Sequence, residues 1–448
     1  MATLNSASQV LPSIYSISSF EDQPKMSAPI SRYLGPLSQR CVLNVLRHTP
    51  AVPMACSNCR CRQFSSKESL TVDVSNLAEM FRVAKQSSGK PLRRLFMTRE
   101  EDPGRHTMQH EGLFYTMQPE THNVLFKEDS FTAEFRKQVE TFNEMTLMVR
   151  RPAVEVISYL KQANYAYPPN KYLLYGSHGT GKTMSLAHII HYCHSQGWMV
   201  LYVPWPSSWN NKFRYLTNSS YKADRWDLPR ESVSWLKQFK TINAEILEKT
   251  PIKTRYSYEW TKREVMEKGS ALTYLIEFGI SRPKFSSDCI GALIKELKCQ
   301  NEELGVRILL AIDGVNSFWR PTAIKLDNKE FADPDKITLI HNFKKLLQTD
   351  WSNGAVVGTV DAKASVKEER ASFMPRYLLK KEGFEWLDPF VPIHVDDYND
   401  KEVNSCIDYY VDKLWIQNPK ALTEEGRNQL IFLTNKNPRI LERTAAAW

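Results

Sequence analysis

The sequence contains no long hydrophobic run and little cysteine. None of its apolar stretches approaches the roughly 18 residues that a membrane-spanning helix needs, so we expect no membrane insertion. Cysteine accounts for 8 of 448 residues. Cys56, Cys59 and Cys61 stand close together, but no second pair at metal-ligand spacing follows them, which argues against a zinc site. The remaining cysteines are scattered, as is typical of thiols in a reducing compartment.

Acidic residues are missing from Gln23 to Lys67, where Arg and Ser recur. Residues 40–47 combine arginine with apolar side chains in a pattern that suits a basic amphipathic helix, and residues 62–65, R-Q-F-S, resemble a matrix-peptidase cleavage site. Residues 1–64 are therefore predicted to be a mitochondrial transit peptide, which places the mature chain in the matrix. A retained basic tail is the alternative, and Met26 is an alternative start because the first twenty residues carry no charge.

The net charge of +9 permits an RNA partner without requiring one. Residues 65–149 form an N-terminal extension, and within it residues 82–99 carry several Lys and Arg side chains and no acid. Such a basic segment is suited to lying along RNA phosphates, although a solvated loop would have the same composition.

One stretch, residues 171–183 with the sequence K-Y-L-L-Y-G-S-H-G-T-G-K-T, predicts a phosphate-binding loop. An apolar run suits a buried strand, the next eight residues match G-x-x-x-x-G-K-[ST], and a helix follows. Glycines let backbone N–H groups approach phosphate oxygens, the lysine supplies a positive charge, and the helix N-terminus favours an anion. The residues expected to contact the nucleotide here are Gly176, Ser177, His178, Gly179, Thr180, Gly181, Lys182, Thr183 and Met184.

A second strand, residues 307–313 with the sequence R-I-L-L-A-I-D, ends in a carboxylate. Its Asp313 and the hydroxyl of Thr183 are the predicted Mg²⁺ ligands. A further apolar strand, residues 355–360, ends near Thr359 and Asp361, and we expect Thr359 to approach the terminal phosphate. Arg439, at the start of the final helix, is a candidate to reach back toward the phosphates, and a surface arginine at a helix start is the equal alternative.

The residue after Asp313 is not the glutamate that polarises water in efficient ATPases of this class. Gly314 stands there, and Asn316 could at most orient water, so hydrolysis is expected to be slow or absent. A Gly314→Glu substitution is expected to raise the rate if the rest of the site is competent.

The remaining pattern predicts an α/β fold with a five-stranded parallel sheet. A P-loop NTPase domain is expected over residues 150–396, with a large, mainly helical insertion at about 204–300, followed by a small helical lid over 397–448. Residues 131–149 and 153–163 are predicted helices. The aromatic residues of the insertion are expected to be core rather than RNA-stacking groups, and they include Trp205, Trp209, Trp226, Trp235 and Trp260.

Taken together, these motifs resemble the AAA+ branch of P-loop NTPases. More closely, G-S-H-G-T-G-K-T, A-I-D-G-V-N-S-F-W, R-R-P-A-V-E and N-P-R-I-L-E-R resemble the family of death-associated protein 3 over residues 66–448. That resemblance implies GTP or GDP with Mg²⁺ as ligands and a place in the small subunit of the mitochondrial ribosome. Subunit rRNA and neighbouring ribosomal proteins would be the partners, and a link to cell-death signalling is also implied. By analogy with AAA+ proteins, Arg150, Arg151 and Pro152 are expected at the base pocket.

The residues themselves do not indicate guanine. Residues 435–438, N-K-N-P, begin like the guanine-binding motif N-K-x-D, but proline replaces the aspartate. A signalling or remodelling NTPase that self-assembles on activation is the alternative function, with Arg370 or Arg376 as an arginine acting on a neighbouring copy. Under the ribosomal interpretation no homo-oligomer is expected.

Overall fold

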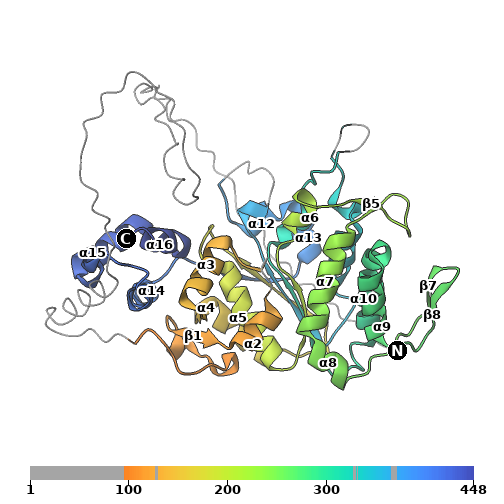
Figure 1. Ribbon diagram of the computed structural model, residues 1–448, viewed down its shortest axis with the longest axis horizontal. Coiled ribbons are helices and arrows are strands. Elements are labelled where there is room, and N and C mark those ends of the chain that lie inside the picture. The colour runs from red at the N-terminus through yellow and green to blue at the C-terminus, as the bar shows by residue number, and fades with distance from the viewer. Residues whose placement is uncertain (1–94, 127–129, 326–328, 330, 365–370) are drawn as a thin grey trace, which may run out of the picture. The chain divides into compact units, whose positions relative to one another are not determined.

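A parallel sheet forms the centre of the fold in the computed structural model, which describes residues 95–126, 130–325, 329, 331–364 and 371–448 (Figure 1). Its five strands lie in the order β11-β3-β10-β9-β4. Their bounds are β3 Asn170–Tyr175, β4 Met199–Val203, β9 Ile308–Ile312, β10 Gly354–Thr359 and β11 Val391–His394. The predicted α/β fold with a five-stranded parallel sheet is confirmed.

The register brings the carboxyl ends of the central strands together. Strand β10 lies between β3 and β9, with Thr359 opposite Leu174 and Gly358 opposite Ile312. The residues that follow β3, β9 and β10 therefore meet at one edge of the sheet, which is where ligands bind in open α/β folds.

Both faces of the sheet are covered by helices, so alternate residues of one strand enter different cores. Leu309 and Ala311 pack with α4 (Arg151–Gln162) and α5 (Lys182–Ser195), whereas Leu310 and Ile312 pack on the opposite face. That opposite face is covered by α7 (Pro229–Ile242), α10 (Ser286–Gln300) and α11 (Thr338–Leu346). Burial on both faces explains why these strands read as continuous apolar runs.

The insertion after β4 is mainly helical, as predicted. It contains α6 (Ser207–Asn211), α7, α8 (Ala244–Lys249), α9 (Leu272–Ser281) and α10, together with two short antiparallel pairs, β5 (Thr217–Asn218) with β6 (Trp226–Asp227) and β7 (Tyr258–Thr261) with β8 (Glu264–Met266). Helices α7, α9 and α10 lie side by side (Figure 1). Trp209 and Trp235 are buried in the core, whereas Trp205, Trp226 and Trp260 are half-buried.

The helix predicted over residues 131–149 is wrong in its second half. Helix α3 (Ala133–Phe142) ends at Asn143, which adopts the left-handed conformation with φ 52° and so stops the helix. The next residues form β2 (Met145–Met148), which pairs antiparallel with β1 (Phe114–Met117). All four residues of β2 are buried, and this continuous burial is what the helical interpretation mistook for one face of a longer helix.

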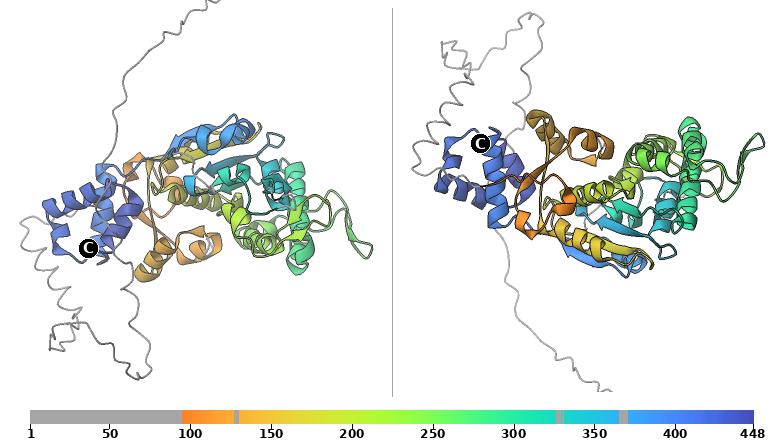
Figure 2. Two further views of the ribbon diagram at one scale, coloured as in Figure 1. Left: turned by 90° about the horizontal axis from the view of Figure 1, so that it is seen from above. Right: turned by 90° about the horizontal axis from the view of Figure 1, so that it is seen from below.

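The chain ends in three helices that share a separate apolar cluster. They are α14 (Asp400–Asp412), α15 (Glu424–Thr434) and α16 (Pro438–Ala445), shown in the darkest blue in Figure 2. The short helices α12 (Pro375–Leu378) and α13 (Lys380–Leu387) precede β11, and α2 (Pro119–Leu125) precedes α3. The helical lid expected at the C-terminus is therefore present.

Several expectations lie outside the described residues: the transit peptide over 1–64, most of the basic segment over 82–99, the clustered cysteines and Arg370. Within the described ranges, no helix is long and apolar enough to cross a membrane.

Candidate functional site: a P-loop cavity

The loop between β3 and α5 is shaped by its glycines and by close packing against the rest of the chain. Gly181 caps α5 with φ 94°, in the left-handed region that favours glycine. A β-carbon on Gly176 would lie 2.2 Å from the carbonyl oxygen of Val395, and one on Gly179 would lie 2.7 Å from Oδ1 of Asn437. The glycines that the motif requires for phosphate approach thus also let β11 and the lid pack onto the loop.

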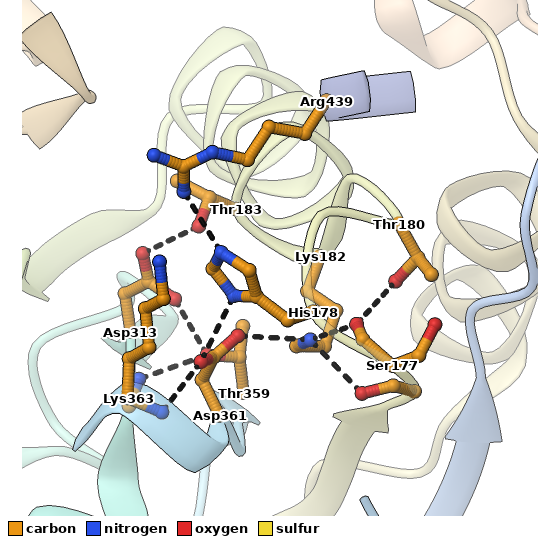
Figure 3. Close-up of polar contacts among 12 residues, drawn as sticks. Ser177, His178, Thr180, Lys182, Thr183, Asp313, Thr359, Asp361, Lys363 and Arg439 are labelled. Atoms are coloured by element: carbon orange, nitrogen blue, oxygen red, sulfur yellow. Dashed lines mark hydrogen bonds and ion pairs between the residues drawn. The ribbon is translucent and has the colours of Figure 1, made fainter. Parts of the chain in front are cut away.

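Lys182 lies at the centre of the site and is only 4 % exposed. Its Nζ donates hydrogen bonds to the carbonyl oxygens of Gly176 at 3.0 Å and Ser177 at 2.7 Å. The same atom forms an ion pair with Oδ2 of Asp361 at 3.0 Å (Figure 3). The ammonium group is therefore buried, held on the inner side of the loop and already paired with a carboxylate.

The two predicted magnesium ligands are in direct contact. Thr183 Oγ1 donates to Oδ2 of Asp313 at 2.7 Å, and Thr359 Oγ1 donates to Oδ1 at 2.5 Å. Burial raises the pKa of Asp313 to about 6, although both hydroxyl groups oppose this shift. A buried carboxylate next to a threonine hydroxyl suits Mg²⁺, which prefers oxygen ligands, and a cation would relieve the cost of burying the charge.

Thr359 has a different place from the one expected. It is fully buried, accepts a hydrogen bond from the backbone N–H of Gly314 at 2.8 Å and donates to Asp313. Its hydroxyl thus holds Asp313 in position, and the group of this strand end that faces the loop lysine is Asp361, two residues further on.

Asp361 carries the second carboxylate of the site. Burial alone would raise its pKa, but the hydrogen bond with His178 and the charge of Lys182 hold the pKa well below the usual range. Asn316 fixes its backbone, accepting from its N–H at 3.1 Å and donating to its carbonyl oxygen at 2.9 Å. Asp361 is therefore an ionised partner of the loop at neutral pH.

His178 links this carboxylate to the lid. Its Nδ1 lies 3.4 Å from Oδ1 of Asp361, and its Nε2 lies 2.9 Å from Nη1 of Arg439 (Figure 3). Because a guanidinium can only donate, Nε2 must accept, and the neutral ring therefore carries its proton on Nδ1 and donates it to Asp361. The backbone N–H of Arg439 also donates to the carbonyl oxygen of Gly179 at 3.2 Å. Arg439 thus contacts the loop, and its contact with phosphate stays a prediction.

Of the three residues expected at a base pocket, Arg150 lines the cavity, whereas Arg151 is exposed and Pro152 is buried in the first turn of α4. Arg150 is 5 % exposed. Its guanidinium donates to Glu402 at 3.0 and 3.2 Å, to the carbonyl oxygen of Asp396 at 2.9 Å and to that of Thr180. Arg150 therefore connects the loop, the end of β11 and α14, a role that its sequence position did not indicate.

Gly314 cannot readily be replaced by a glutamate. Its φ is +82°, and a β-carbon there would lie 3.1 Å from the ring of Trp205 and 3.3 Å from Ala364. The expectation that Gly314→Glu would install a base is therefore corrected: a side chain at this position meets both backbone strain and a neighbouring indole. Asn316 offers no substitute, since both its amide atoms are bonded to the backbone of Asp361.

The side chains of Lys182, Asp313 and Arg439 line one cavity of about 790 Å³, which we call the P-loop cavity. It extends from the loop in two directions, toward α6 and α7 of the insertion and toward the space between the lid and α3–β2. Its loop side includes His178, Gly179, Gly181, Lys182, Thr183 and Met184, and Asp313 and Asp361 also line it. This volume falls in the range of small-molecule sites.

Comparison with known proteins agrees with this architecture. The family model of mitochondrial ribosomal death-associated protein 3 matches residues 147–444. The chain belongs to this family. Relatives named small ribosomal subunit protein mS29 are 45 % identical in Bos taurus, over 79 % of this chain and 88 % of the relative, and 40 % identical in Mus musculus, over 81 % and 93 %.

Two solved structures align with the chain at low similarity. A Walker-type ATPase of Pyrococcus abyssi aligns with a TM-score of 0.36 at 11 % identity, covering 66 % of this chain and 65 % of that chain. AMPPCP-bound DnaA from Aquifex aeolicus aligns with a TM-score of 0.30 at 15 % identity, covering 66 % and 59 %. The fold assignment rests on the order of the strands and the phosphate loop rather than on these distant likenesses.

Proposed function

We propose that this protein is a component of the small subunit of the mitochondrial ribosome and that its P-loop cavity holds a guanine nucleotide with Mg²⁺. The observation that carries the nucleotide part is the meeting of Lys182, Thr183, Asp313 and Asp361 at the carboxyl edge of the sheet, around a glycine-rich loop. The ribosomal part is supported by the family and by the names of its mammalian relatives.

In this proposal each part of the site has one task. The N–H groups of the loop and the Lys182 ammonium bind phosphate oxygens, while Thr183 and Asp313 hold Mg²⁺, which supplies positive charge between the phosphates. Arg439 contributes donors from the lid side. Guanine is proposed on the strength of the family resemblance, since the chain lacks the usual guanine motif.

Hydrolysis is proposed to be weak or absent. A general base must lie within hydrogen-bond reach of the attacking water. Asp313 is engaged by two hydroxyl groups, and Asp361 is a poor base because its pKa lies well below the usual range. The nucleotide would then stabilise the protein within the subunit or act as a slow switch.

The proposed setting follows from the same family membership. The protein would lie in the mitochondrial matrix, act as a single copy within the subunit, and contact rRNA and neighbouring ribosomal proteins. Exposed basic side chains such as Lys253, Lys262 and Arg263 on the insertion are available for such contacts.

Two measurements test the proposal. Sedimentation of a mitochondrial lysate should place the protein with the small ribosomal subunit; self-oligomers outside that fraction would instead support a self-assembling signalling NTPase.

Thermal melting with Mg-GTP tests the cavity. A nucleotide at a hundred times its dissociation constant adds about 2.7 kcal/mol to the stability of the folded state. We expect the corresponding rise in melting temperature in wild type and in the surface control Lys240→Ala, whose side chain pairs with an exposed glutamate. Lys182→Ala should abolish the shift, and an equal shift in this variant would contradict nucleotide binding at the loop.

A further inference from the structure

The part of the P-loop cavity between the lid and α3–β2 has the character of a base pocket. We call it the lid arm, and it is lined by Phe135, Gln138, Met148, Tyr398, Pro438 and Glu442. Most of these residues present apolar or aromatic surface, which suits the faces of a purine ring. The Tyr398 ring is itself held in place by the Arg150 guanidinium, whose carbon lies 4.9 Å from the ring centroid.

Glu442 is the unusual member of the lid arm. Its Oε1 is buried and has no hydrogen-bond partner among the described residues. The two arginines of the same helix do not satisfy it, because Arg439 and Arg443 both point to Glu134, at 3.4 and 2.7 Å. A buried carboxylate oxygen without a donor is costly, and the same residue lines the cavity, so a ligand there that brings donors would relieve this cost.

Helix α16 aligns this carboxylate with the phosphate site. Arg439 and Glu442 are three residues apart and so lie on one face of α16, with Arg439 at the loop and Glu442 one turn further away. A ligand whose phosphates lie on the loop and whose base enters the lid arm would therefore meet Arg439 first and Glu442 at its far end.

We propose that Glu442 selects the base in this cavity and that the base it selects is guanine, an inference that rests on the proposed nucleotide binding. Guanine presents two adjacent donors, N1–H and the N2 amine, which match the two oxygens of a carboxylate. Adenine presents the lone pair of N1 at the same place, which a carboxylate repels. Glu442 thus takes the role of the aspartate in the guanine-binding motif N-K-x-D, which residues 435–438 lack.

Binding of Mg-GTP, Mg-ATP and Mg-ITP to the full chain tests the inference without any substitution. Hypoxanthine in ITP keeps N1–H but lacks the N2 amine. We expect wild type to prefer GTP over ATP by at least about tenfold, with ITP between them, since each charge-assisted hydrogen bond contributes to discrimination.

Glu442→Gln sharpens the test. An amide can donate to adenine N1 and accept from its N6 amine, so this variant should lose about tenfold or more in GTP affinity and gain affinity for ATP. The control is Glu425→Gln, an exposed change on helix α15 of the same lid, which should behave like wild type.

The possible failures are distinguishable. If wild type binds nucleotides but GTP, ITP and ATP bind equally, or if Glu442→Gln keeps the wild-type ratio, the assignment of Glu442 is wrong while nucleotide binding stands. If none of the three binds to wild type, the proposed function fails and this inference fails with it. Circular dichroism tests whether the variant is folded. If it is not, equal binding of GTP, ITP and ATP by wild type still refutes the assignment of Glu442.

Discussion

The site contains two carboxylates at the ends of neighbouring strands, and their surroundings shift their pKa values in opposite directions. Asp313 follows β9 and receives hydrogen bonds from two neutral hydroxyl groups, and burial raises its pKa to about 6. Asp361 follows β10 and faces Lys182 and His178, which hold its pKa well below the usual range. Two aspartates at one sheet edge thus acquire different chemistry from their neighbours alone.

This difference separates their roles in ligand binding. Asp361 already has its cation, so it stabilises the folded protein before any ligand arrives. Asp313 has hydrogen bonds but no direct ion pair with any of the described residues, so a divalent cation would lower the cost of burying its charge. The same contrast leads to opposite effects of substitution at the two positions.

The largest expected effect is that of Asp361→Asn. The substitution leaves Lys182, 4 % exposed, without its carboxylate, and breaking a buried pair in this way costs about 3 kcal/mol of unfolding free energy. Urea unfolding at pH 7 measures this loss. As a control, Asp350→Asn removes a carboxylate whose side chain is 57 % exposed and should unfold almost like wild type. An Asp361→Asn variant as stable as Asp350→Asn would show that the ion pair contributes little.

Asp313→Asn is expected to raise the unfolding free energy of the nucleotide-free protein rather than lower it. Its folded-state pKa of about 6, against an ordinary value of 3.8, means that the ionised group opposes folding at pH 7 by up to about 3 kcal/mol. Without nucleotide, Asp313→Asn should therefore be more stable than wild type, and it should lose the stabilisation by Mg-GTP. Urea unfolding with and without Mg-GTP checks both. A destabilised nucleotide-free variant would refute this account of Asp313.

The dependence of stability on pH should distinguish the two carboxylates. The folded chain holds the Asp313 proton more tightly than the unfolded chain does, so this group stabilises the protein as the pH falls from about 6 to about 4. The maximal slope for one group is about 1.4 kcal/mol per pH unit. The contribution of Asp361 is present above pH 3.8 and is lost as the pH falls further.

The measurement is the difference in unfolding free energy between wild type and Asp313→Asn across this range. Other groups, such as Asp288 with a pKa raised to about 6 by burial, titrate in both proteins and cancel in the difference. A difference that stays constant between pH 4 and 6 would contradict the raised pKa of Asp313.

The smallest expected effect concerns hydrolysis. Turnover should lie well below the roughly 10 per second of a typical enzyme, and Gly314→Glu should not raise it, because φ of +82° and the Trp205 ring disfavour a side chain there. Single-turnover hydrolysis of radiolabelled GTP by both proteins measures this. Steady wild-type turnover above about one per second, lost in Lys182→Ala, would favour an active NTPase over the ribosomal interpretation.

The sequence predicted those parts of the site that lie within one continuous stretch of residues or directly after an apolar strand. The strand, loop and helix around Lys182 are one stretch of chain, and an apolar strand that ends in aspartate identified Asp313. Contacts between distant segments were not predictable in this way. Arg150 and Glu402 are 252 residues apart, and His178 and Asp361 are 183 apart, so no local pattern connects them.

Local patterns also failed where burial is continuous. Residues 145–148 continue the apolar pattern of α3, and only the left-handed conformation of Asn143 separates helix from strand. The sequence predicts Thr359 rather than Asp361 at the phosphates, because polarity alone cannot show which of two residues at one strand end turns toward the loop.

The bonds of Arg150 have a consequence for how the protein is made. This side chain is buried against the phosphate loop, yet its carboxylate partner Glu402 lies 252 residues later in the chain. At ordinary translation rates, about 10 to 50 seconds pass between the synthesis of these two residues. A growing chain that has already produced the loop and its helix therefore carries an arginine with no counter-ion, and the P-loop cavity can be completed only when nearly the whole protein has been synthesised.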